Sequence, residues 1–87
     1  MPQIIVTAID EYHFQVTVID SSNTTHQVSI KPNYALKLNA GKITTAQLVR
    51  KSFEFLLERE TNTSILRSFD LSVIARYFPE YEQIITQ

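Results

Sequence analysis

The sequence predicts an α+β fold, in which a three-stranded antiparallel meander is followed by three or four helices packed on one sheet face. Residues 3–31 alternate with a period of two and are rich in β-branched side chains, which is typical of strands with one buried face. Beyond Pro32 the apolar residues recur at helical spacing instead. The 87 residues suit a single domain (1–87), made of a β-meander (3–31) and a helical part (32–87).

Three strands are expected before the proline. The first, residues 3–9, is largely apolar on both faces, and the second, residues 12–18, alternates between apolar and polar side chains. The third spans residues 25–31. Short turns rich in Asp, Ser and Asn join the strands, and such connections favour antiparallel pairing. The second and third strands are expected to place these side chains in the core: Tyr12, Phe14, Val16, Val18, Val28 and Ile30.

A short helix is expected over residues 32–39. Proline cannot donate to a strand ladder, and its fixed φ suits the first position of a helix. Gly41 follows this helix at the place where a left-handed C-terminal cap is common.

The next helix is predicted over residues 45–60. Thr44 and Gln47 have the spacing of a capping box, which marks a helix start. Because the apolar arc of this helix is wide, we expect part of it to meet the C-terminal segment or another subunit. The arc consists of Leu48, Val49, Ser52, Phe53, Phe55, Leu56 and Leu57.

Short helical pieces are expected in the rest of the chain. Ser64 is placed to cap a brief turn, and Asp70 to cap a helix over residues 71–78. Pro79 ends that helix. A last turn or two is expected over residues 81–85, which contain Tyr81 and two isoleucines.

The composition excludes several classes of function. A net charge of −1 argues against nucleic-acid binding, which needs clustered basic residues. The chain has no cysteine and one glycine, so thiolate metal sites and glycine-rich phosphate loops are excluded and no cofactor is expected. Since neither a signal sequence nor an apolar run of membrane-spanning length is present, we expect a soluble, cytoplasmic protein with no membrane partner.

Metal binding and catalysis are not expected either. The two histidines, His13 and His26, lie on neighbouring strands, and His26 is expected to be half-exposed and nearly opposite Ile19, too far from His13 for a shared metal. The serines in the helical half are explained by helix capping and turns. We therefore expect no enzymatic activity.

The most distinctive sequence is ERETNTSILRSFDL at residues 58–71, followed by YFPEY at residues 77–81. It resembles a family of short bacterial proteins of unknown function that have a β-meander followed by helices. The resemblance covers most of the chain, most clearly from His26 onward, although Thr61 stands where the family has proline. It implies a bacterial, cytosolic, single-domain protein and brings no activity, cofactor or catalytic residue with it.

Four charged residues of this segment form a candidate junction: Arg59, Glu60, Arg67 and Asp70. By helical angle, Arg59 and Glu60 fall within the apolar arc, so they lie either beyond the helix end or against buried partners. Arg67 and Asp70 are the nearest candidates for such partners. A structural role is favoured over a ligand site, because charged residues at helix junctions usually satisfy loose backbone ends.

The leading functional hypothesis is a non-catalytic protein-interaction or assembly module. Its basis is the surplus of apolar surface on the first strand, on the helix arc and around Tyr77 and Tyr81. The simplest partner is a second copy of the chain, in a two-fold homodimer. In such a dimer either the first strand pairs edge to edge with its copy, or the sheet face bearing Ile5 and Ile9 packs on a second sheet. The alternative is a small-molecule-binding or enzymatic protein with its site at the Arg59, Arg67 and Asp70 junction, which a concave pocket with these side chains unpaired would favour.

Overall fold

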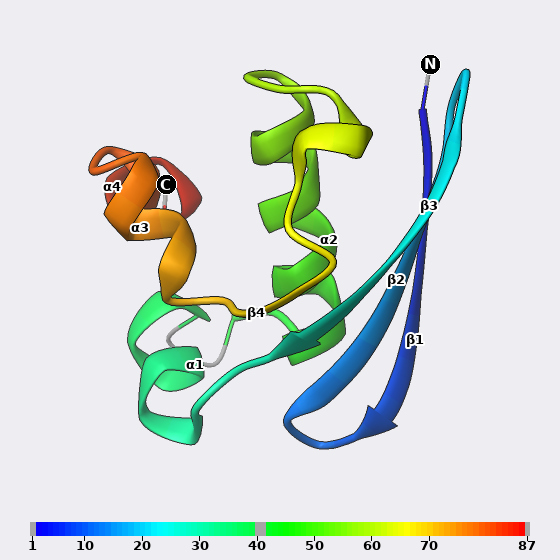
Figure 1. Cartoon of the computed structure of the whole chain (residues 1–87). Coiled ribbons are helices and arrows are strands. Elements are labelled where there is room, and N and C mark those ends of the chain that lie inside the picture. Colours follow the sequence, from blue (N-terminus) through cyan, green and yellow to red (C-terminus); the bar gives the residue numbers. More distant parts are fainter. Residues whose placement is uncertain (1, 40–41, 87) are drawn as a thin grey trace.

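The computed structural model describes residues 2–39 and 42–86. It confirms the α+β class (Figure 1). In chain order the elements are β1 (Gln3–Asp10), β2 (His13–Ile19), β3 (Asn23–Ser29), α1 (Pro32–Asn39), α2 (Thr45–Leu57), the 3₁₀ turn η1 (Asn62–Ser64), β4 (Ser68–Asp70), α3 (Val73–Tyr77) and α4 (Tyr81–Ile85).

The sheet has four strands in the order β1-β2-β3-β4, and not three as expected. The first three form the predicted antiparallel meander, whereas β4 pairs parallel to β3, with Phe69 opposite Val28. A strand of three residues is too short to show a period of two, so its pairing depends on the tertiary structure.

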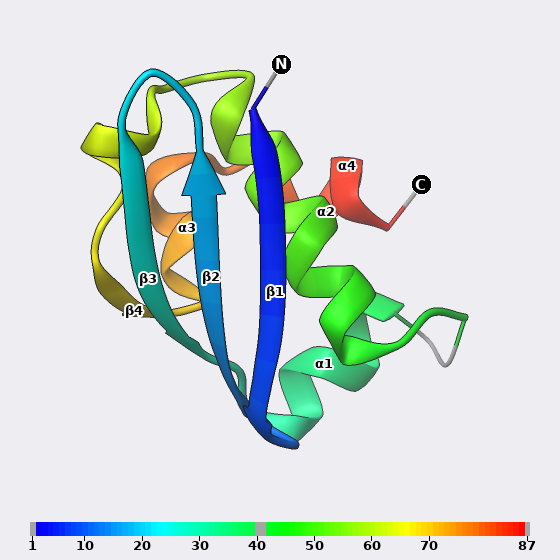
Figure 2. The ribbon, with the colours of Figure 1, turned by 90° about the vertical axis from the view of Figure 1, so that its right-hand side faces the viewer.

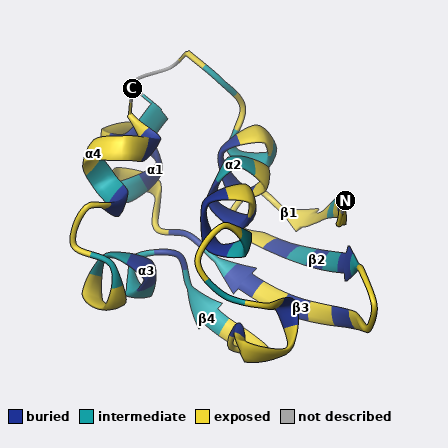
Figure 3. Ribbon diagram, turned by 90° about the horizontal axis from the view of Figure 1, so that it is seen from above, coloured by how far each residue is buried: buried dark blue, intermediate teal, exposed yellow. Residues whose placement is uncertain are grey.

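The described helices lie on one side of the sheet. Figure 1 shows α2 against the strands, with α3 and α4 on the far side of α2. Figure 2 looks onto the other face of the sheet, which no described helix covers. The alternation of buried and exposed residues along β2 and β3 follows from this arrangement (Figure 3).

The core lies between the sheet and α2. Val16, Val18 and Val28 enter it from the strands, and Leu48 and Phe53 enter it from α2. The predicted face of α2 is confirmed, because six of its seven arc residues are buried and Leu57 packs against the core.

Two tyrosines differ from the expectation. Tyr12 is not a core residue, because it lies in the turn before β2 and is exposed. Tyr81 is fully buried: its ring packs edge-on against Phe55, and its hydroxyl lies 2.6 Å from Ser52 Oγ. The C-terminal segment therefore covers part of the α2 arc, as predicted, and Tyr81 contributes nothing to the apolar surface.

The first helix and the start of the second are confirmed. α1 has the predicted bounds, and Thr44 and Gln47 form the capping box, with Gln47 N–H donating to Thr44 Oγ1 at 3.1 Å and Thr44 N–H donating to Gln47 Oε1 at 2.9 Å. The expected cap at Gly41 lies outside the described residues. α2 ends at Leu57, three residues earlier than predicted. Within residues 2–39 and 42–86, no helix is long and apolar enough to cross a membrane.

Candidate functional site

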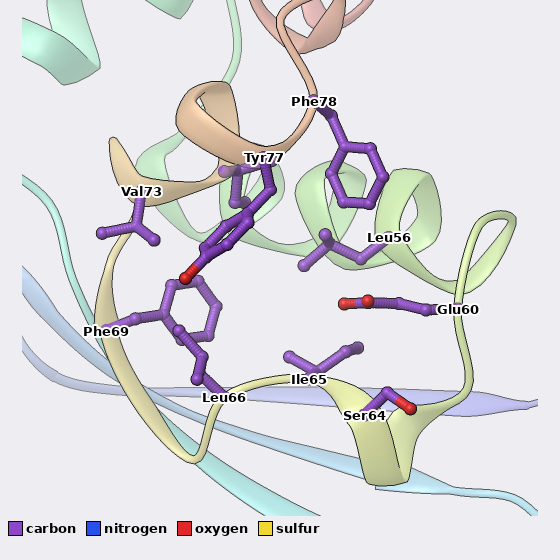
Figure 4. A pocket seen from close by; sticks show the side chains of 10 residues that line it. Leu56, Glu60, Ser64, Ile65, Leu66, Phe69, Val73, Tyr77 and Phe78 are labelled. Atoms are coloured by element: carbon purple, nitrogen blue, oxygen red, sulfur yellow. The ribbon is translucent and has the colours of Figure 1, made fainter.

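An open groove of about 360 Å³ lies between the end of α2, the segment after it, β4 and α3 (Figure 4). We call it the Glu60 groove. Its walls are mostly apolar, and Glu60 is the only residue among them with a carboxylate or a basic group. The lining residues are Leu56, Glu60, Ser64, Ile65, Leu66, Phe69, Val73, Ile74, Tyr77 and Phe78.

Glu60 is held at the groove by the end of α2. The N–H groups of Arg59 and Glu60 both donate to the carbonyl of Leu56, each at 2.9 Å, which closes the last turn and carries the two residues out of the helix. In Figure 4 the Glu60 carboxylate points into the groove between Leu56 and Ile65.

The Glu60 carboxylate has no compensating partner. It makes no hydrogen bond or ion pair with any residue that the structure describes. Burial against the apolar walls raises the pKa of this carboxyl above its ordinary value. Its negative charge is therefore only partly hydrated and not neutralised.

A buried hydrogen-bond network fixes the wall that carries Ile65 and Leu66. Asn62 Nδ2 donates to the carbonyl of Ser22 at 2.7 Å and to Thr24 Oγ1 at 3.1 Å. His26 donates from Nδ1 to the carbonyl of Leu66 at 2.7 Å, so its Nε2 is free to accept a hydrogen bond from the Thr24 hydroxyl at 2.9 Å. These bonds join β3 to a segment about forty positions later in the chain, and they set the groove wall.

His26 therefore has a different place from the one expected. It pairs with Val16, because β3 starts at Asn23 opposite Ile19, and its ring is fully buried, 5.3 Å from the ring of Phe53. Burial lowers the pKa of His26, which keeps the ring neutral and suits the tautomer that the network requires.

The other histidine lies on the opposite side of the sheet. His13 Nδ1 is 2.9 Å from a carboxylate oxygen of Asp10, at the exposed start of β2. Among residues 2–39 and 42–86, no group of three His, Asp or Glu side chains is close enough to hold a metal ion.

Arg59 lies beyond the helix end, and its partner is not one of the predicted junction residues. Its guanidinium stacks on Phe55, with Cζ 3.7 Å from the ring centroid, and Nη1 donates to the carbonyl of Phe55 at 3.1 Å. Nε lies 3.5 Å from a carboxylate oxygen of Glu80. Arg59 thus joins α2 to the segment before α4 and does not line the groove.

Asp70 is occupied by hydrogen bonds from two serines. Its carboxylate accepts hydrogen bonds from Ser29 Oγ at 2.9 Å, and from Ser72 N and Oγ at 3.1 and 2.6 Å. Burial opposes ionisation of this carboxyl, but the bonds from the two serines outweigh it and lower the pKa of Asp70. The predicted capping role is wrong, because α3 begins at Val73 with Ser72 as its N-cap and no side-chain cap bond, and Asp70 instead closes the turn before the helix.

The four predicted residues do not form one ion-paired cluster. Arg67 is exposed and its side chain has no hydrogen-bond or ion-pair partner among the described residues, although its backbone carbonyl accepts from Gln27 N–H at 2.7 Å. Of the four, only Glu60 lines the groove. The sequence contained one indication of this groove, because Glu60 is an acidic residue within the apolar arc of its helix. It contained no indication that Phe69 and Tyr77 form the groove walls.

Arg67→Ala is expected to change the free energy of unfolding by no more than about 0.5 kcal/mol, because an exposed side chain without a partner contributes little. Denaturant unfolding measures this. Arg59→Ala is the comparison, and it should cost more because it removes the contacts with Phe55 and Glu80. A larger loss of stability for Arg67→Ala than for Arg59→Ala would instead support the predicted ion-paired junction.

Comparison with known proteins adds no relative: no family model matches the chain, and no curated protein and no solved structure is significantly similar to it. The resemblance of residues 58–71 to a bacterial family therefore stays a prediction.

Proposed function

We propose that the protein is a non-catalytic protein-interaction module that associates with a second copy of itself through β1. The observation that carries this proposal is the free edge of β1, which pairs with β2 on one side and with no described strand on the other. Ile5 and Ile9 on this strand are 39% and 59% exposed. An uncovered, apolar edge strand is a template for pairing with another chain.

The charge pattern favours a second copy as the partner. When a strand pairs with its own copy about a two-fold axis, a charge near the axis approaches the same charge on the copy. Residues 3–9 contain no charged residue and no proline, so neither repulsion nor a missing donor opposes the pairing. The other edge is less suitable, because β4 is only three residues long.

The chemistry of the Glu60 groove supports a role in binding over one in catalysis. General acid–base catalysis usually needs a second titratable group close to the first. Apart from the phenol of Tyr77, Glu60 is the only titratable side chain that lines the groove, and Asp70 and Arg59 are occupied elsewhere. Because residues 58–71 resemble a family of bacterial proteins, we also propose that this module works in the bacterial cytoplasm.

Light scattering and sedimentation over a wide range of concentrations test the proposal. We expect a dimer of twice the 10.0 kDa chain mass. Ile5→Lys should weaken association by at least about tenfold, because it removes an apolar contact and places one lysine charge from each chain in the same interface. It should leave folding intact, since Ile5 faces solvent in one chain.

Gln27→Lys is the matched control. Gln27 is exposed on the same uncovered face, but on β3, two strands away from the free edge. The variant should dimerise normally if the edge is the interface. Equal loss of association in the two variants would indicate stacking of sheet faces, and a parent protein that is monomeric at all concentrations would refute self-association.

A further inference from the structure

The Glu60 groove has the size and walls of a small-ligand site. Its volume of about 360 Å³ falls within the range of ligand pockets, roughly 300–1,000 Å³. Tyr77 and Leu66 are 67% and 48% exposed, although both are large apolar residues. The groove therefore offers apolar surface that no described residue covers.

The charge of the groove selects among ligands. A ligand carboxylate would be repelled by Glu60. A neutral ligand would displace water from the Glu60 carboxylate without providing an opposite charge in its place. A cation would neutralise that charge. Burial against the groove walls, which raises the pKa of Glu60, leaves the carboxylate with less water to stabilise its charge.

The lining also favours a small molecule over a peptide. A peptide that binds by strand addition needs main-chain partners along a free strand, but β4, which reaches the groove through Phe69, has only three residues. A small ligand with one charged group needs only the apolar walls and one carboxylate. The polar atoms of the lining side chains, on Glu60, Ser64 and Tyr77, are sufficient for such a ligand.

From these observations we infer that the Glu60 groove binds a small organic amine, with its apolar body between α2 and α3 and its ammonium group on the Glu60 carboxylate. The Tyr77 ring at the mouth adds an aromatic surface that suits both an apolar body and a cation. This site is separate from the β1 edge, so its failure would leave the proposed self-association untouched.

The test compares three probes of similar size and different charge: phenethylamine, phenethyl alcohol and phenylacetate. Amide chemical shifts of the labelled protein are followed during titration with each. We expect the amine to shift the amides of the groove residues, the alcohol to bind about tenfold more weakly, and phenylacetate to bind least. Amine binding should also lower the pKa of Glu60, which a titration of its side-chain carbon signal measures.

Two variants separate the charge from the rest of the groove. Glu60→Gln should weaken amine binding by about tenfold and leave binding of the alcohol unchanged, because only the ion pair is lost. Glu58→Gln makes the same change at an exposed neighbour outside the groove, and it should alter binding of neither the amine nor the alcohol. Thermal melts confirm that both variants fold.

The inference would be overturned by equal binding of the amine and the alcohol, or by amine binding that Glu60→Gln leaves unchanged. Shifts confined to amides outside the groove, or no shifts up to the solubility limit of the amine, would also refute it.

Discussion

Replacing Phe53 by alanine is expected to lower the free energy of unfolding by about 3–5 kcal/mol, the usual cost of removing a buried phenylalanine ring. Phe53 is fully buried at the centre of the α2 face. Its ring centroid lies 5.3 Å from that of His26 and 6.0 Å from that of Phe69, so the cavity would open against β3 and β4 together. Denaturant unfolding measures the loss.

Thr44→Ala is the control on the same helix. It removes one bond of the capping box at an exposed position, and it should cost about 1 kcal/mol. If Phe53→Ala were no more destabilising than Thr44→Ala, α2 could not present this face to the sheet.

Asn62→Ala is expected to cost about 1–3 kcal/mol, because it removes both hydrogen bonds that a buried amide donates. The carbonyl of Ser22 and the hydroxyl of Thr24 would both lose the Asn62 amide. Since this amide ties the segment after α2 to the β2–β3 turn, hydrogen exchange at residues 64–66 should also become faster.

Asn23→Ala is the matched comparison for this prediction. Asn23 lies in the same β hairpin but is exposed, so its replacement should change the free energy of unfolding by no more than about 0.5 kcal/mol. Equal effects of the two substitutions, or unchanged exchange at residues 64–66, would show that the network does not hold the groove wall.

Features governed by neighbouring residues could be predicted from the sequence. The meander follows from a period of two and short polar turns. The start of α1 follows from Pro32, and the start of α2 follows from the Thr44 capping box. Each of these features depends on side chains within a few positions of one another, so the sequence alone is enough to predict it.

Features that join distant segments could not be predicted in this way. β4 exists because Phe69 meets Val28, and Tyr81 is buried because it meets Phe55 and Ser52. Periodicity shows which side of an element is apolar, but not which later segment covers it. For the same reason Arg59 pairs with Glu80 and not with the nearer charges of the predicted junction.

The candidate site combines both kinds of information. The sequence by itself determined that α2 is apolar over a wide arc and that Glu60 falls within that arc. Only the tertiary structure decided that the helix ends before Glu60 and that α3 and the segment around Ile65 form a groove around it. The buried bonds of Asn62 and His26 that hold this wall span about forty residues, a separation over which no local pattern operates.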